Sequence, residues 1–203
     1  MDRAASAALL GGAGIAVAAG GVAAFGTADG DTGLRSGPVP WALSALAVAV
    51  GLVLLGAYRI SIGRPRRLAA AGVGIAVAGL SVTAAMLLAI GVSGALGLDA
   101  LNDGTSAVST AGTLVASVAT LLLAPLGLLL FSSAVLLDRR LPLGVRVMPL
   151  VATGVSVGGP PLVAVVAEQG EAVVLAAWVL LMGGAWAAFG VRCGQAQLGD
   201  SDR

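Results

Sequence analysis

The sequence predicts an all-α membrane protein, a bundle of six transmembrane helices with the N-terminus and the C-terminus both cytoplasmic. Composition is the first observation behind this fold class, because the 203-residue chain is 58% hydrophobic and only 10% charged. Soluble domains contain about 25% charged residues. The second observation is that the apolar residues fall in six long stretches that contain no Asp, Glu, Lys or Arg.

Each stretch is long enough to cross a bilayer, because a helix of about 20 apolar residues spans about 30 Å of hydrocarbon. In chain order the predicted spans are 4–26, 39–58, 68–95, 107–137, 147–167 and 172–191. They occupy almost the whole chain, so we expect a single polytopic membrane domain, 1–203, and no soluble domain. The first span follows Arg3 and ends in small residues, so cleavage as a signal peptide is an alternative for it. Its length favours a retained helix.

The spans differ in detail. The second span begins near Trp41 and ends at Tyr58, as is typical of aromatic residues at the two membrane interfaces. The fourth is longer than a bilayer requires, so we expect it to tilt or project, with a kink at Pro125. In the fifth, the stretch Gly158–Pro161 (GGPP) predicts a break or a kink, because proline lacks an N–H group.

Small residues predict how the helices pack. Close backbone approach drives helix association in lipid, and 31 of the 203 residues are glycine. A small residue recurs at every fourth position of the first span, at Ala4, Ala8, Gly12, Ala16, Gly20 and Ala24. The sixth span has Ala176, Gly184 and Ala188 in a similar register. These faces either pack inside the bundle or join it to a second protein, and the sequence leaves both open.

The arginines predict the orientation. All 11 basic residues are arginine, and 10 of them lie before the first span, after the sixth, or in the loops that follow the second and fourth. Only Arg35 lies on the other side, where the loops are acidic. The positive-inside rule therefore places both termini in the cytoplasm. The Ala/Gly/Val-rich, lysine-free composition indicates a GC-rich prokaryote, so we expect a multi-pass protein of a prokaryotic plasma membrane.

Several motifs imitate catalytic or binding sites. Residues 154–158 (GVSVG) match the G-x-S-x-G of a hydrolase, and residues 91–94 (GVSG) match the G-x-S-G of an intramembrane protease. Neither serine has an activating base, because the chain contains no His and no Lys. Residues 12–14 (GAG) resemble the start of a dinucleotide-binding fingerprint, but that fingerprint follows a strand, whereas these residues lie in a membrane span. Residues 29–33 (DGDTG) lack the later ligands of a calcium loop. We therefore expect no catalytic residue, no cofactor and no metal.

Polar groups nevertheless fall at a common depth. Counting about 1.5 Å per residue from the cytoplasmic helix ends places them about 18–25 Å into the membrane. This predicted layer, in the outer half of the bilayer, consists of Ser44, Ser81, Thr83, Thr120, Gly158, Gly159, Pro160, Pro161 and Trp178, and Ser156, two residues before Gly158, is grouped with it. The layer either lines an outward-facing polar pocket or is made of ordinary packing residues and a proline kink.

Three functions fit this sequence. The favoured one is a non-enzymatic accessory or assembly subunit, held in the lipid bilayer and forming a homo- or hetero-oligomer through Gly/Ala faces. The alternative is a small permease or channel for a neutral or lipophilic solute, which would use the polar layer. A membrane enzyme ranks third, because no acid–base pair accompanies the arginines. No feature of the chain indicates binding to nucleic acid.

Overall fold

The computed structural model describes residues 3–28, 38–60, 66–96, 107–139, 141–166 and 171–201. All regular structure in these ranges is helical. The elements are α1 (Arg3–Ala28), α2 (Val39–Ile60), α3 (Arg66–Ala95), α4 (Ala107–Val118), the π-helical turn η2 (Ala119–Leu123), α5 (Ala124–Leu137), α6 (Leu143–Val166) and α7 (Glu171–Ser201). Because α4, η2 and α5 are continuous, these elements make six helical rods.

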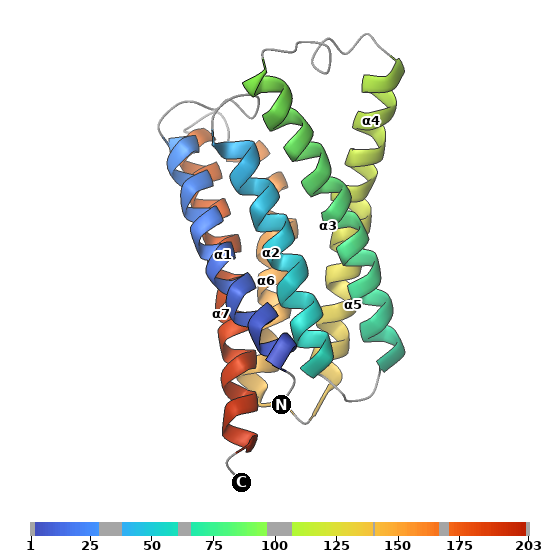
Figure 1. Ribbon diagram of the computed structural model, residues 1–203, viewed down its shortest axis with the longest axis vertical. Helices are drawn as coiled ribbons and strands as arrows, with labels where there is room; N and C mark the ends of the chain where they lie inside the picture. Colours follow the sequence, from blue (N-terminus) through green and yellow to red (C-terminus); the bar gives the residue numbers. More distant parts are fainter. Residues whose placement is uncertain are drawn as a thin grey trace.

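The predicted fold class is confirmed in two respects: the described residues form helices, and several of these helices could span a membrane. Within the described ranges, five helical segments are long and apolar enough to cross a membrane, namely Ala5–Thr27, Val39–Arg59, Arg67–Ala95, Leu114–Leu137 and Ala172–Ala196. The sixth rod, α6, has a shorter apolar segment, Leu143–Gly159, within its 24 residues. The long axes of the rods run roughly along the bundle, and the beginning of α1 and the end of α7 lie at the same end of it (Figure 1).

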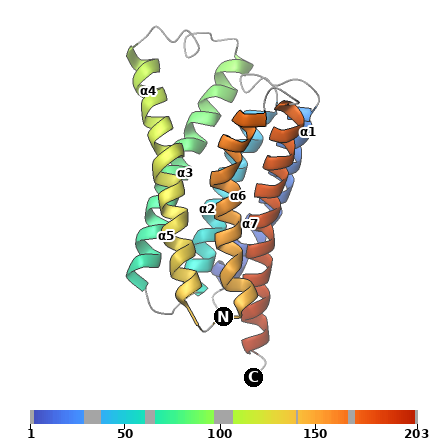
Figure 2. The ribbon, with the colours of Figure 1, turned by 180° about the vertical axis from the view of Figure 1, so that it is seen from behind.

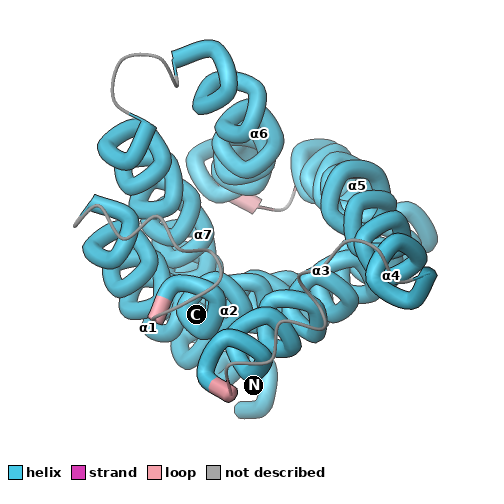
Figure 3. Tube along the Cα trace, turned by 90° about the horizontal axis from the view of Figure 1, so that it is seen from above, coloured by secondary structure: helices cyan, strands magenta, loops and turns pink. Residues whose placement is uncertain are grey.

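The rods are arranged as a ring. Seen from above, α1 lies outside α2 and α7, while α3, α5 and α6 complete the circuit (Figure 3). Contacts follow this order, from α2 to α3, α3 to α5, α5 to α6, α6 to α7, and α7 back to α1 and α2. The exception is α4, which inclines away from α6 at the edge of the bundle in both side views (Figure 2).

Helix α1 packs against α2 and α7 through its predicted small-residue face. A Cβ atom added to Gly12 would lie 2.9 Å from the carbonyl oxygen of Ala49 on α2. A Cβ atom added to Gly183 on α7 would lie 2.7 Å from the carbonyl oxygen of Ala16. Glycine therefore lets these backbones approach more closely than any larger residue would allow. This face of α1 lies inside the bundle.

Helices α3 and α5 meet in the same way. A Cβ atom on Gly127 of α5 would overlap the backbone of Ala76, and one on Gly79 of α3 would lie 2.6 Å from the amide nitrogen of Ala124. On the other side of the ring, the ring of Trp186 packs edge-to-face on that of Phe189, with centroids 6.1 Å apart. Small residues therefore form these crossings, while Trp186 and Phe189 of α7 are large side chains that are fully buried in the core.

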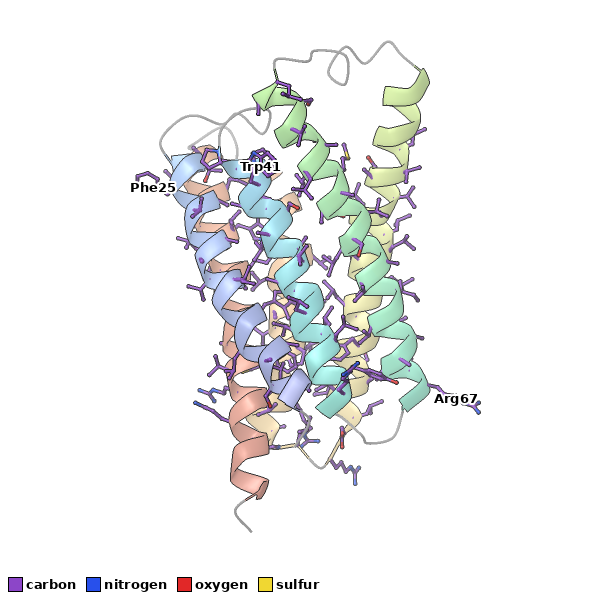
Figure 4. The ribbon with its side chains drawn as sticks, viewed as in Figure 1. Phe25, Trp41 and Arg67 are labelled. Carbon is purple, nitrogen blue, oxygen red and sulfur yellow. The ribbon has the colours of Figure 1, made fainter. Side chains whose placement is uncertain are left out.

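The two ends of the bundle differ in their side chains. Trp41 and Phe25 project at one end and Arg67 at the other (Figure 4). Phe25 is 76% exposed and Trp41 43% exposed, and Trp41 covers Gly91 of α3, where an added Cβ would lie 3.0 Å from the indole. Exposed aromatic side chains at a helix end are typical of the membrane interface.

Candidate functional site

One cluster of the predicted layer joins α3 to the π turn. The hydroxyl of Thr83 donates to the carbonyl oxygen of Gly79, at 2.9 Å, and lies 2.8 Å from the hydroxyl of Thr120. Because a hydroxyl has one proton, Thr120 is the donor in the second bond. The structure therefore brings Thr83 and Thr120 together, with lone pairs of the Thr120 oxygen still available as acceptors.

Two other predicted residues lie on α2 and α3. Ser44 is buried and donates to the carbonyl oxygen of Ala84, at 3.1 Å, which links α2 to α3. Ser81 is exposed. Ser44 therefore acts as a hydrogen-bonded link between helices, and Ser81 takes no part in the cluster formed by Thr83 and Thr120.

A second cluster joins α6 to α7. Ser156 donates to the carbonyl oxygen of Ala152 one turn earlier, at 2.8 Å, and accepts a hydrogen bond from the indole of Trp186, at 3.0 Å. It lies inside a continuous helix rather than at a strand-to-helix turn, so the geometry of a hydrolase nucleophile is absent at this residue. Ser156 therefore links helices: its hydroxyl proton and one lone pair of its oxygen are used in these two hydrogen bonds.

Trp178 supplies the other link between α6 and α7. Its indole N–H donates to the carbonyl oxygen of Val155, at 2.7 Å. The ring lies against Gly159, where an added Cβ would overlap the indole. The GGPP stretch thus contributes a glycine contact surface for a tryptophan.

The predicted break at 158–161 is corrected by the structure, because α6 remains α-helical from Leu143 to Val166. Pro160 and Pro161 lie in this helix, and Gly158 is exposed. Each proline removes one backbone donor, but the φ angle that its ring imposes is a helical value. The neighbouring turns can therefore continue through the pair.

The predicted layer is thus divided into two clusters. Thr83 and Thr120 belong to α3 and η2, whereas Ser156, Gly159 and Trp178 belong to α6 and α7. In the described part of the chain, neither α3 nor η2 makes an extensive contact with α6 or α7. The two clusters lie on different arcs of the ring in Figure 3.

Sequence reasoning did not identify the polar contact between α5 and α6. Ser132 donates to the carbonyl oxygen of Pro149, at 3.0 Å, and its oxygen lies 2.8 Å from the hydroxyl of Thr153. Ser132 and Thr153 are both fully buried. The sequence did contain a signal for a polar face on this helix. Thr153 and Ser156 are three residues apart, and residues so spaced are neighbours on one helix face.

The π turn was also not predicted. In η2 the N–H of Ala124 bonds to the carbonyl oxygen of Ala119, five residues earlier, immediately before Pro125. Pro125 was expected to cause a kink, and the backbone accommodates it with this wider turn. π turns inside α-helices are frequently found at functional sites.

Comparison of the chain with protein families, with curated proteins and with solved structures finds no match. The chemistry available is therefore that of the clusters themselves. Both offer neutral hydroxyl groups and backbone carbonyl oxygens, and the described part of the chain holds no group of three or more His, Cys, Asp or Glu side chains placed to hold a metal ion. Such groups can bind by hydrogen bonds but supply no titratable acid or base.

Proposed function

We propose that the protein is a six-span protein of a prokaryotic plasma membrane, with both termini cytoplasmic. The distribution of the arginines supports this orientation. The length of α6, 24 residues or about 36 Å at 1.5 Å per residue, supports its assignment as a span.

A labelling experiment tests the orientation. In a Cys193→Ser background, Ser61→Cys should react with a membrane-impermeant maleimide only in inverted vesicles. Ser36→Cys should react from outside intact cells. Labelling of Ser61→Cys from outside intact cells would show that the proposed orientation is reversed.

Within that membrane we propose a non-enzymatic accessory or assembly subunit. The observation that carries this function is a second small-residue face on α1. Gly12 and Gly20 are buried inside the bundle, whereas Gly11, Gly14 and Ala18 are exposed. Cβ atoms added to Gly11 and Gly14 would meet no atom within 4 Å. A helix from another protein could approach this outer face as closely as α2 and α7 approach the inner one.

Three leucine substitutions on α1 separate folding from partner binding. Gly12→Leu should disrupt the fold, because its Cβ alone would lie 2.9 Å from a backbone oxygen of α2. Gly14→Leu should leave helicity and monomer stability intact but remove a co-purifying partner. Val17→Leu, at a position that is 56% exposed, is the control and should retain the partner.

The outcome also identifies the kind of partner. Two differently tagged copies of this chain co-purify if the complex is a homo-oligomer, whereas a second polypeptide co-purifies if it is a hetero-oligomer. In either case Gly14→Leu should weaken the complex at least tenfold relative to Val17→Leu. Equal recovery with both variants would rule out this face as the interface.

The alternative function, a small permease or channel for a neutral or lipophilic solute, is favoured by one observation. The Thr83–Thr120 pair places neutral hydroxyl groups beside an irregular turn of a membrane helix. Proteoliposome flux of small neutral solutes tests it, with Thr120→Val as the variant. Flux that equals that of empty liposomes would exclude the permease without affecting the subunit proposal.

A further inference from the structure

The π turn changes the hydrogen bonding of the rod formed by α4 and α5. In an α-helix, each carbonyl oxygen accepts from the N–H four residues later. In η2 the N–H of Ala124 instead donates to the carbonyl oxygen of Ala119. The carbonyl of Thr120 therefore loses Ala124, its α-helical donor. The donor five residues after Thr120 would be Pro125, which has no N–H.

The carbonyl of Leu121 loses its donor for a related reason, because its α-helical donor would also be Pro125. Over the described residues, the side-chain hydrogen bond at this turn joins the hydroxyl groups of Thr120 and Thr83 and involves neither carbonyl oxygen. Two consecutive backbone acceptors thus lack their α-helical donors.

These acceptors lie within the depth of the membrane. Thr120 and Leu121 are 17 and 16 residues before Leu137, the end of α5, which is about 24–26 Å along a hydrocarbon layer of about 30 Å. A backbone polar group left unsatisfied in lipid costs several kcal/mol, so irregular backbone at this depth occurs where it is buried in protein or lines water.

Protein covers only one side of this turn. The side chain of Leu121 is 65% exposed and that of Leu122 is 62% exposed, and Thr120 is exposed as well. On the covered side, Gly79 lets α3 approach the turn. On the uncovered side, donors from outside the chain can reach the turn.

We propose that the π turn is a binding site for an O–H donor, which donates to the carbonyl oxygens of Thr120 and Leu121 beside the Thr83–Thr120 hydroxyl pair. Water and the hydroxyl groups of a small neutral polyol share this chemistry. The occupant is uncharged, because the stretch 107–137 contains no ionisable side chain. This site goes beyond the proposed subunit function and does not depend on it.

Selective isotope labelling can observe the site directly, because threonine is followed by leucine at only two positions, Thr113–Leu114 and Thr120–Leu121. The full-length protein in lipid nanodiscs, with carbonyl-13C threonine and 15N leucine, should give two carbonyl–nitrogen correlations. Thr113 lies within α4 and provides the internal reference. A Thr113→Ser variant assigns the two signals by removing one.

Two measurements then distinguish the sources of the O–H donor. Magnetisation transfer from water protons to the Thr120 carbonyl, but not to that of Thr113, identifies bound water. A saturable shift of the Thr120 carbonyl signal on addition of glycerol, again without a change at Thr113, identifies a polyol site. If the Thr120 carbonyl shows neither response, the proposal is wrong.

The Pro125→Ala variant provides the matching test. It restores an N–H that can bond to the carbonyl of Thr120 or Leu121, so the water transfer and the glycerol shift should both be lost. Circular dichroism checks that the variant keeps its helicity. A response in Pro125→Ala equal to that of the natural chain would overturn the assignment to the π turn.

Discussion

Replacing Gly127 with alanine should destabilise the bundle, because the new Cβ atom would overlap the backbone of Ala76 on α3. Overpacking of a well-packed core costs about 1–3 kcal/mol. The obstructing atoms here include the backbone nitrogen and Cα of Ala76, which cannot rotate away, so we expect the upper part of that range, about 2–3 kcal/mol. Alanine is the better helix former by about 1 kcal/mol, so the net loss of unfolding free energy should be about 1–2 kcal/mol.

Gly74→Ala is the matched control. Gly74 is exposed on α3, and a Cβ atom there would meet nothing within 4 Å. Only the propensity effect remains, so this variant should be more stable than the natural chain by up to about 1 kcal/mol. The two alanine variants should therefore differ by about 2–3 kcal/mol, which is a factor of about 30–150 in the unfolding equilibrium.

Reversible unfolding in mixed micelles of increasing SDS content, followed by circular dichroism, measures this difference. The natural chain and the two variants should be compared at equal protein and lipid concentrations. If Gly127→Ala is as stable as Gly74→Ala, the close crossing of α3 and α5 does not exist as described.

Three further predictions concern the interior. Ser132→Ala should lower the unfolding free energy by about 1–2 kcal/mol in the same assay, because it removes the hydroxyl link between α5 and α6, whereas Ala at the exposed Ser133 should have little effect. Trp186→Phe keeps an aromatic ring but removes the indole donor to Ser156, so it should cost about 0.5–1.7 kcal/mol, and a cost of zero would show that this bond contributes no stability. Cys193, which is 1% exposed, should resist a bulky maleimide in the native protein and react once SDS unfolds it; rapid native labelling would contradict its burial.

The helical membrane fold was predictable because it depends on composition and on the length of apolar runs. A long apolar run without charged residues, such as 39–58, predicts a membrane helix by itself, whichever helices pack against it. The inward face of α1 followed from the same local signal. Its four-residue spacing of small residues predicted a packing face, and Gly12 and Gly20 are buried against α2 and α7.

The grouping of the polar residues was not predictable in the same way. Depth along a helix can be counted from the sequence, but the direction in which a side chain points around the bundle depends on which helices are neighbours. Ser44 and Trp178 lie at similar predicted depths, yet Ser44 donates to the carbonyl oxygen of Ala84 and Trp178 to that of Val155. The π turn was not predicted because the segment ahead of Pro125 has two hydrogen-bond registers open to it, and the residue types alone do not select between them.

The contact between α1 and α7 has a consequence for the synthesis of the protein. Helix α1 precedes α7 by four other helical rods, yet the two helices pack against each other, with Gly20 and Gly183 at their crossing. Until α7 has been inserted, the glycine face of α1 that α7 will cover is open to lipid or to any other helix nearby. The contact between these two helices can therefore form only after α7 has been translated, and a protein truncated before Glu171 would keep that face of α1 uncovered.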